Sequence, residues 1–292
     1  PLVHKVRLAI KEWRDKNYDG ASETSKALLN FWFNTEHHLN NGDPFRFYFA
    51  QREAMESIIY LYEVVKARDK YELLRYDSSE RISLSMFPEN WCRYVIKMAT
   101  GTGKTKVMSL ALVWSYYHKL YENNSSLSQT FLIITPNIIV LNRLRKDYDN
   151  LRVFKDEPLI PENGYADKNW QNDFQITLHI QDELKPITSQ GNIFLTNIHR
   201  VFLQDDTLTL EEEFKGKKPK PDSDKTKGMD LGELLRSNKI KDLVLFNDEA
   251  HHIHDENLAW FRNIQDVNNQ LKLKEDNGIA LQVDFKIGRA HV

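Results

Sequence analysis

The chain has 292 residues, of which 41% are apolar and 28% are charged, as in ordinary globular proteins. Its formal net charge is −2, so overall charge predicts no polyanion partner, and a nucleic-acid site would have to be a local basic surface. The one cysteine, Cys92, excludes a disulfide framework and cysteine-rich zinc modules. No apolar run approaches the roughly 18–20 residues that cross a bilayer, and no signal-peptide pattern opens the chain. We therefore expect a cytoplasmic protein with no membrane partner.

Residues 1–43 carry short stretches of helical periodicity separated by polar loops, which predicts a helical N-terminal segment. The next stretch, 44–51, is rich in aromatic residues and leads into a helix over about 51–68. Apolar residues recur on one stripe of that helix, which indicates that it packs against a core.

The segment Met98–Thr105, MATGTGKT, lies between a short apolar strand and an amphipathic helix. This order is typical of a phosphate-binding loop, in which backbone N–H groups and the helix dipole face the anion. Gly101 and Gly103 let the backbone approach the phosphates, Lys104 would reach the β- and γ-phosphates, and the Thr105 hydroxyl would coordinate Mg²⁺. The alternative is a Gly/Thr-rich turn with an accidental lysine, because Met98 stands where the strict pattern has glycine.

Short apolar runs alternate with helical patterns along the rest of the chain. These runs are 130–135, 192–196, 242–246 and 279–285, and the segment 174–180 alternates in polarity like a strand. Buried strands that alternate with helices predict an α/β fold, in which helices cover both faces of a mostly parallel sheet.

We predict that one domain covers 44–285. Within it, 204–230 is charged, bears prolines and is almost free of aliphatic residues, so we expect a flexible insertion. Its lysines could touch nucleic acid, but acids flank them on both sides, which favours a solvated linker. Residues 286–292 end in IGRAHV, which resembles a translated sequencing adapter, so we expect a non-native tail there. Because the chain also opens without methionine, we expect it to be a fragment.

An apolar run followed by Asp248 and Glu249 is the second feature that points to nucleotide hydrolysis. A carboxylate at the end of a central strand can hold Mg²⁺, and the adjacent Glu249 can orient or deprotonate the attacking water. The alternative is a zinc site built with His251, His252 and His254. Zinc-binding helices place their histidines four residues apart, and this spacing differs from that pattern.

The motifs occur in the order found in superfamily 2 helicases. MATGTGKT, TPN at 135–137, LTNIHR at 195–200 and NDEAHH at 247–252 resemble motifs I, Ia, Ib and II of that group. With FYFAQREAMESIIYL at 47–61 and the ending LQVDF, the chain is most similar to the Res (helicase/translocase) subunit of type III restriction enzymes. The resemblance covers about 44–285 and implies a RecA-like P-loop NTPase domain that uses ATP and Mg²⁺.

The resemblance also implies residue roles. Gln51 would hydrogen-bond the adenine edge, for which an amide is suited because it both donates and accepts; the alternative is an exposed glutamine at a helix start. The loop cradle would be Thr100, Gly101, Thr102 and Gly103, with Lys104, Asp248 and Glu249 catalytic and with Thr105 and Asp248 holding Mg²⁺.

Two further groups of residues receive roles by the same resemblance. His251 would couple the nucleotide site to a neighbouring strand. Contacts to a nucleic-acid backbone would come from Thr135, Pro136, Asn137, Thr196, Asn197 and Arg200, whose hydroxyls, amides and cations suit contacts that do not depend on base sequence. For Thr196 and Asn197, ordinary capping of a strand end is the alternative.

The sequence therefore predicts the first motor domain of a DNA-dependent ATPase in a type III restriction–modification system. Expected partners are DNA, with RNA not excluded, and a methyltransferase (Mod) subunit. The family's second RecA-like domain, its arginine finger and a nuclease domain have no counterpart in this chain, so we expect weak ATP binding and slow hydrolysis at best. The alternatives are an ATP-gated nucleic-acid-binding or scaffold module and a kinase-like phosphotransferase.

Overall fold

The structure is a computed structural model that describes residues 2–74, 89–180, 183, 185–197, 238–248, 257–275 and 278–288. Its elements are α1 (Leu2–Asp15), α2 (Glu23–Asn34), β1 (His37–His38), β2 (Pro44–Phe45), α3 (Phe49–Ile59), η1 (Tyr60–Val64), α4 (Lys70–Leu74), β3 (Arg93–Met98), α5 (Lys104–Tyr121), β4 (Thr130–Thr135), α6 (Ile138–Tyr148), η3 (Asp149–Leu151), α7 (Arg152–Asp156), η4 (Tyr165–Asp167), α8 (Trp170–Asp173), β5 (Thr177–Ile180), β6 (Asn192–Asn197), β7 (Asp242–Asn247), α12 (Asn257–Glu275) and β8 (Gly278–Ile287).

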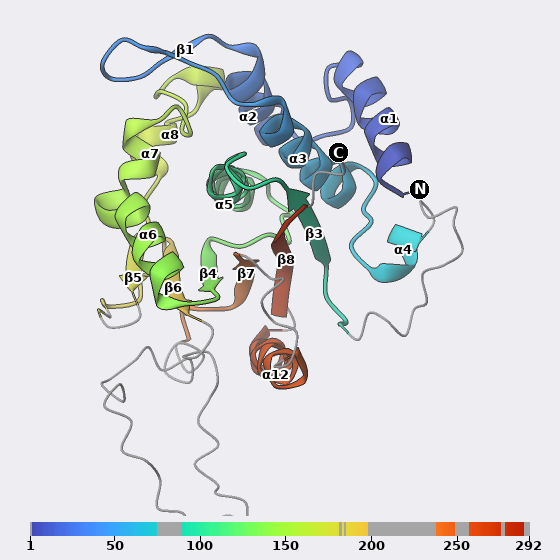
Figure 1. The fold of residues 1–292 in the computed structure, drawn as a ribbon, viewed down its shortest axis with the longest axis vertical. Helices are drawn as coiled ribbons and strands as arrows, with labels where there is room; N and C mark the ends of the chain where they lie inside the picture. Colours follow the sequence, from blue (N-terminus) through green and yellow to red (C-terminus); the bar gives the residue numbers. More distant parts are fainter. Residues whose placement is uncertain are drawn as a thin grey trace, which may run out of the picture.

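A six-stranded sheet in the order β3-β8-β7-β4-β6-β5 forms the centre, and all its strand pairs are parallel. Helix α5 lies over one face and α12 over the other (Figure 1). Strands β4, β6 and β7 are buried along their whole length, as expected for the middle of a parallel sheet covered on both sides. The predicted α/β class, with helices on both faces and a helical N-terminal part, is confirmed.

Successive side chains of each strand point to opposite faces of the sheet, so they join two separate cores. On the α5 side, Ile133 and Phe246 join the larger core with residues of α2, α3 and α5. On the other side, Leu132 and Leu245 pack with Ile264, Val267 and Leu271, the last three from α12. The strands therefore hold their ends in fixed positions, which matters for the site at those ends.

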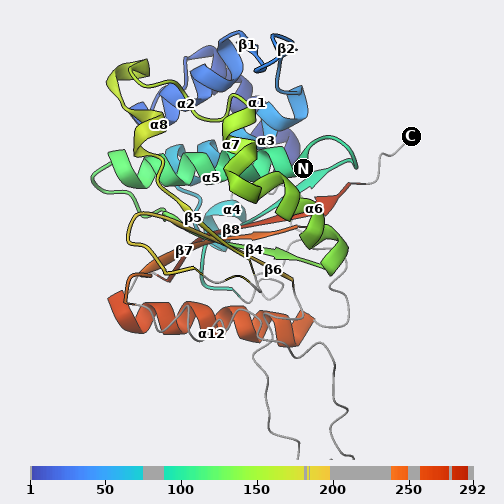
Figure 2. The same cartoon turned by 90° about the vertical axis from the view of Figure 1, so that its left-hand side faces the viewer.

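The N-terminal helices pack on the outside of α5, and Figure 2 shows them stacked above it on the side away from the sheet. The carboxylate of Glu56 holds α1 and α3 together in this layer. Glu56 of α3 is fully buried and accepts hydrogen bonds from Arg14 of α1 at 2.9 Å, Arg52 at 2.8 Å and the Tyr18 hydroxyl at 2.8 Å. Because burying an unpaired carboxylate is very unfavourable, Glu56 fixes α3 against α1.

Several boundaries differ from those expected. Residues 152–172, which lack clear periodicity, contain the short helices α7 and α8. Strand β8 runs to Ile287, which pairs with Met98, two residues beyond the end expected at 285. The insertion at 204–230 lies outside the described residues. Among the helices that the structure describes, none is long and apolar enough to cross a membrane.

Candidate nucleotide-binding site

The sheet register brings the predicted motifs to one edge. Met98, which opens the phosphate loop, pairs with Ile287 at the end of β8. Asn247, which precedes Asp248, pairs with Asp284 of the same strand. On the other side, Thr135 at the end of β4 pairs with Asn197 at the end of β6. All these positions therefore lie at the carboxyl edge, where open α/β sheets bind ligands.

The loop Met98–Thr105 turns tightly because two glycines adopt left-handed backbone. Gly101 has φ 80° and Gly103 has φ 87°, conformations that other residues rarely adopt. Thr102 closes the turn, since its N–H and its hydroxyl both donate to the Ala99 carbonyl, at 3.3 and 2.7 Å. Gly103 is the N-cap of α5, and Lys104, only 8% exposed, is the first residue of that helix. The loop thus presents the start of an 18-residue helix, which favours an anion.

Gln51 contacts the loop directly, which the sequence did not reveal. Its amide nitrogen donates to the Thr102 carbonyl at 3.1 Å, and its amide oxygen accepts from the Tyr48 N–H at 2.9 Å. A Cβ built on Gly103 would lie 2.2 Å from that amide nitrogen, so any other residue there would displace the Gln51 side chain from the loop, and the φ of 87° also favours glycine. The predicted hydrogen bond to adenine is not tested by the structure. The signal for the observed contact was Gln51's place as the third residue of a helix, where an amide can cap the start.

A cavity of about 360 Å³ lies beside the loop and is lined in part by Gln51, Gly103 and Thr105. Lys106 of α5 forms an ion pair with Glu157 on its wall. Burial lowers the pKa of Lys106 to about 8, and the Asp147 carboxylate opposes that change. At pH 7 the ammonium group therefore remains mostly protonated, and it keeps the helix start attached to the segment after α7.

Asp248 is buried at the end of β7, as predicted. Its N–H donates to the Ile134 carbonyl of β4 at 3.0 Å, which fixes its backbone. One carboxylate oxygen accepts from Arg143 of α6 at 3.2 Å. That guanidinium side chain is 55% exposed, whereas the Asp248 side chain is fully buried. The predicted roles of Glu249 and His251, and the alternative zinc site at His251, His252 and His254, fall outside the described residues.

The donor set around Asp248 suits magnesium. Mg²⁺ is usually held by one or two carboxylates together with substrate phosphates and waters, and not by a cage of protein ligands. The Arg143 guanidinium already places one positive charge at the Asp248 carboxylate. Among the residues that the structure describes, no group of three or more His, Cys, Asp or Glu side chains could hold a metal ion.

The predicted nucleic-acid residues divide into buried and exposed ones. Thr135 and Thr196 are buried, and their hydroxyls donate to backbone carbonyls at 3.3 and 3.4 Å. Asn137 is exposed and caps α6, because its side-chain oxygen accepts from the N–H groups of Ile139 and Val140, both at 3.0 Å. Arg200 falls outside the described residues.

Asn137 is the N-cap of α6, a local role that the resemblance did not assign to it. Asn197 is buried, Pro136 is half-buried, and Asn137 stays at the surface of the carboxyl edge. Nothing in the structure tests whether any of them contacts nucleic acid, so that role stays a prediction.

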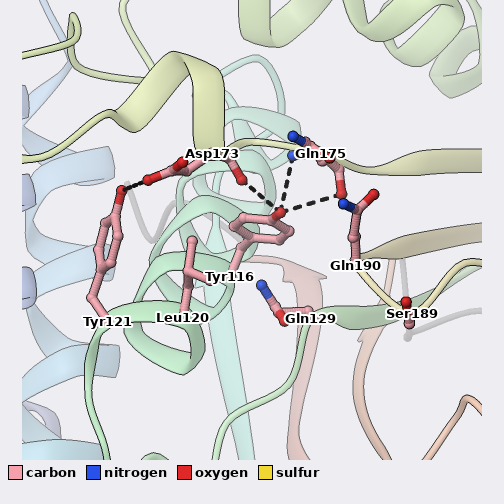
Figure 3. Close-up of a pocket in the computed structure, with 8 residues that line it drawn as sticks. All are labelled: Tyr116, Leu120, Tyr121, Gln129, Asp173, Gln175, Ser189 and Gln190. Atoms are coloured by element: carbon pink, nitrogen blue, oxygen red, sulfur yellow. Dashed lines mark hydrogen bonds between the residues drawn. The ribbon is translucent and has the colours of Figure 1, made fainter.

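A second cavity, of about 440 Å³, lies at the opposite, amino edge of the sheet, near the residues that precede β4, β5 and β6. Figure 3 shows the hydroxyls of Tyr116 and Tyr121 turned toward Asp173 and Gln175. Tyr116 accepts from the Gln175 N–H at 2.9 Å and donates to the Asp173 carbonyl at 2.8 Å, while Tyr121 donates to the Asp173 carboxylate at 2.8 Å. These hydroxyls stabilise the turn into β5 and are remote from the predicted motifs.

A comparison of the chain with models of protein families identifies the family to which it belongs. The family model for the type III restriction enzyme, Res subunit, matches residues 45–275. The chain belongs to this family. It therefore contains a helicase-like ATPase motor domain, and the resemblance drawn from the motifs is confirmed. The Res family in general hydrolyses ATP with Mg²⁺, binds nucleic acid and works with a Mod partner. No curated protein and no solved structure matches the chain.

Proposed function

We propose that the chain is the ATP-binding first motor domain of a DNA-dependent helicase or translocase in a type III restriction–modification system. The observation that supports this most is the shared carboxyl edge: the phosphate loop follows β3, Asp248 follows β7, and Asn137 caps the helix after β4. A nucleotide site and a surface for a nucleic-acid strand would then be neighbours on one rigid sheet.

In this proposal the loop residues hold the phosphates. Backbone N–H groups at Thr100–Gly103 and the start of α5 face the anion, and the Lys104 ammonium neutralises its charge. The Thr105 hydroxyl and the Asp248 carboxylate would hold Mg²⁺, which when bound neutralises developing charge on the transferred phosphoryl group. Glu249 accepts a proton from the attacking water or orients it. Gln51, whose amide donates to the Thr102 carbonyl, would recognise the adenine base while it stays in contact with the phosphate loop.

The remaining parts of the proposal concern partners. DNA would lie along the edge carried by Pro136 and Asn137, with Arg200 as a phosphate contact and His251 coupling that edge to the nucleotide. A second RecA-like domain would supply the arginine finger, and Mod and nuclease functions would complete the enzyme. Hydrolysis would then alternately close and open the two motor domains along DNA.

The test is phosphate release by the chain with and without DNA, at fixed ATP and Mg²⁺, with Glu249→Gln as the blank. We expect DNA to raise the rate above that blank and Asn137→Ala to reduce the stimulation. Asn34→Ala, a surface asparagine on α2, serves as the matched control. In a full-length homologue that carries both motor domains, ATP binding with no effect of DNA on turnover would contradict the motor and favour the ATP-gated binding module. Repeating the assay with RNA of the same sequence shows whether DNA or RNA stimulates turnover more.

Arg143 gives a prediction about the metal. Arg143→Ala is expected to lower the Mg²⁺ concentration at half-maximal ATP binding by up to about fivefold, because a competing cation is removed from Asp248. Solvent at the 55% exposed Arg143 side chain screens this pair to about 1 kcal/mol. Fluorescence titration with a labelled ATP analogue measures this midpoint. Arg145→Ala, on the same helix but paired with Glu183, should leave it unchanged. A higher midpoint for Arg143→Ala would instead mean that Arg143 orients Asp248 for the metal.

A further inference from the structure

Strand β8 separates the two halves of the proposed site, and its Asp284 is fully buried between them. On one side lies β3, which ends at the phosphate loop, and on the other lies β7, which ends at Asp248. A carboxylate in the middle of a buried sheet is unusual, because transfer of the charge from water is unfavourable unless it is fully paired. Asp284 therefore needs an explanation that the hydrophobic core does not supply.

Asp284 is saturated with donors. One carboxylate oxygen accepts from Arg93 Nε at 2.8 Å and from Arg93 Nη2 at 2.5 Å. The other accepts from Asn247 Nδ2 at 2.5 Å and from Gln282 Nε2 at 2.9 Å. These bonds use about four acceptor sites, the full capacity of a carboxylate. The donors come from β3, β7 and β8 itself, so one side chain ties three strands together.

The contact reaches the predicted metal ligand through one peptide bond. Asn247, held by Asp284 on one side, is followed directly by Asp248, whose N–H is held by Ile134 of β4 on the other. The chain at the end of β7 is thus fastened from both neighbouring strands. Arg93 begins the strand that ends in the phosphate loop, and it also contacts Glu89 at 3.3 Å.

We propose that Asp284 is a positioning residue for nucleotide chemistry: through Asn247 and Arg93 its carboxylate fixes the place of Asp248 relative to the phosphate loop. The inference rests on the proposed function, since it concerns the metal held by Asp248. Backbone hydrogen bonds alone set the strand register. The side-chain bonds add a restraint from β8 at the residue before Asp248, whose own backbone N–H is held from the β4 side. Groups that orient a metal ligand commonly change metal affinity when they are removed.

The test separates positioning from simple stabilisation. Asn247→Ala removes the link to Asp248 while leaving the Arg93–Asp284 ion pair, and it is expected to raise the Mg²⁺ midpoint for binding of a labelled ATP analogue about tenfold. Asp284→Asn should raise it at least as much, because an amide places an N–H group against donors. Trp91→Phe is the matched control: it removes the 2.8 Å bond to Gln282 in the same network and should lower the thermal midpoint without moving the Mg²⁺ midpoint.

The outcomes are distinct. An Mg²⁺ midpoint that is unchanged in Asn247→Ala, in a chain that still binds ATP with Mg²⁺, would overturn the positioning role and leave the proposed function intact. Absence of any ATP binding by the unmodified chain would overturn both. If Asp284→Asn does not fold, Asn247→Ala carries the test, because its shape change is small and it leaves no buried charge unpaired. If the Mg²⁺ midpoint rises equally in Trp91→Phe, the network affects Mg²⁺ binding only through the general stability of the fold, and the positioning role is overturned.

Discussion

Lys104→Ala is expected to lower the affinity of the chain for ATP by at least about tenfold, since a hydrogen bond to a charged group contributes about 1.5–3 kcal/mol. The lysine is nearly buried at the first position of α5, directly after the glycine that caps this helix. In the proposed function its ammonium neutralises the charge of the phosphates that the loop holds. Alanine is the best helix former, so the fold should be preserved. Fluorescence titration with a labelled ATP analogue, together with a thermal melt, measures both effects.

The control for this change is Lys97→Ala. Lys97 lies on β3 just before the loop, but its side chain is exposed on the surface. Its removal changes the net charge by the same amount and should leave ATP affinity within about twofold, because exposed charges are strongly screened. Equal affinity for ATP in Lys104→Ala and the unmodified chain would show that the glycine loop is a turn with an accidental lysine.

The second large predicted effect is on the stability of the fold and not on nucleotide binding. Glu56→Ala is expected to lower the free energy of unfolding by about 3–5 kcal/mol, because it leaves two half-buried guanidinium groups and the buried Tyr18 hydroxyl without their carboxylate partner. The bonds lost are those from Arg14, Arg52 and Tyr18. Urea denaturation followed by tryptophan fluorescence gives this value.

Glu53→Ala is the matched control, one turn earlier on the same helix. Its pair with Arg7 lies at the surface, with the Arg7 side chain 59% exposed, so its loss should change stability by about 1 kcal/mol or less. Similar small effects for both variants would mean that the N-terminal helices are held by their apolar contacts, and that Glu56 contributes little.

Much of the fold follows from the sequence because its strands are short apolar runs. The run at 130–135 coincides with β4, and those at 192–196 and 242–246 each differ from β6 and β7 by one residue. Buried parallel strands lack the alternation of surface strands, so their whole length is visible as apolar residues. The helix that begins with the phosphate loop was also clear, because Gly-Lys-Thr marks its start.

What the sequence could not give is the order of strands. Periodicity describes one element at a time and carries no information on its neighbours, so the place of β8 between β3 and β7 was not predicted. For the same reason the local pattern does not distinguish Asp284 from other strand residues, although its side chain joins those three strands. The helix pattern offers Glu56 the partner Arg52 one turn earlier, but its bonds from Arg14 and Tyr18 depend on the docking of the segment that contains α1.

For the candidate site, the sequence predicts where Asp248 lies but not which residues it and Gln51 contact. Asp248 lies at a buried strand end, as the motif required, but its ion pair with Arg143 depends on how α6 returns over the sheet. Gln51 was assigned to the base, whereas its observed partners are backbone groups of Tyr48 and Thr102. The contacts of Asp248 with Arg143 and of Gln51 with Thr102 join residues far apart in sequence, which local patterns do not predict, whereas the bond between Gln51 and Tyr48 is a local helix cap.

The central claim is that the phosphate loop and Asp248 form one Mg²⁺-dependent ATP site across β8. Calorimetric titration of the chain with ATP, in Mg²⁺ and in a chelator, tests it for the unmodified protein and for Asp248→Asn. We predict that Mg²⁺ tightens ATP binding in the unmodified chain and has little effect in Asp248→Asn, while binding in the chelator is the same for both. An equal gain from Mg²⁺ in the two proteins would contradict the account, because the metal would then be held without Asp248.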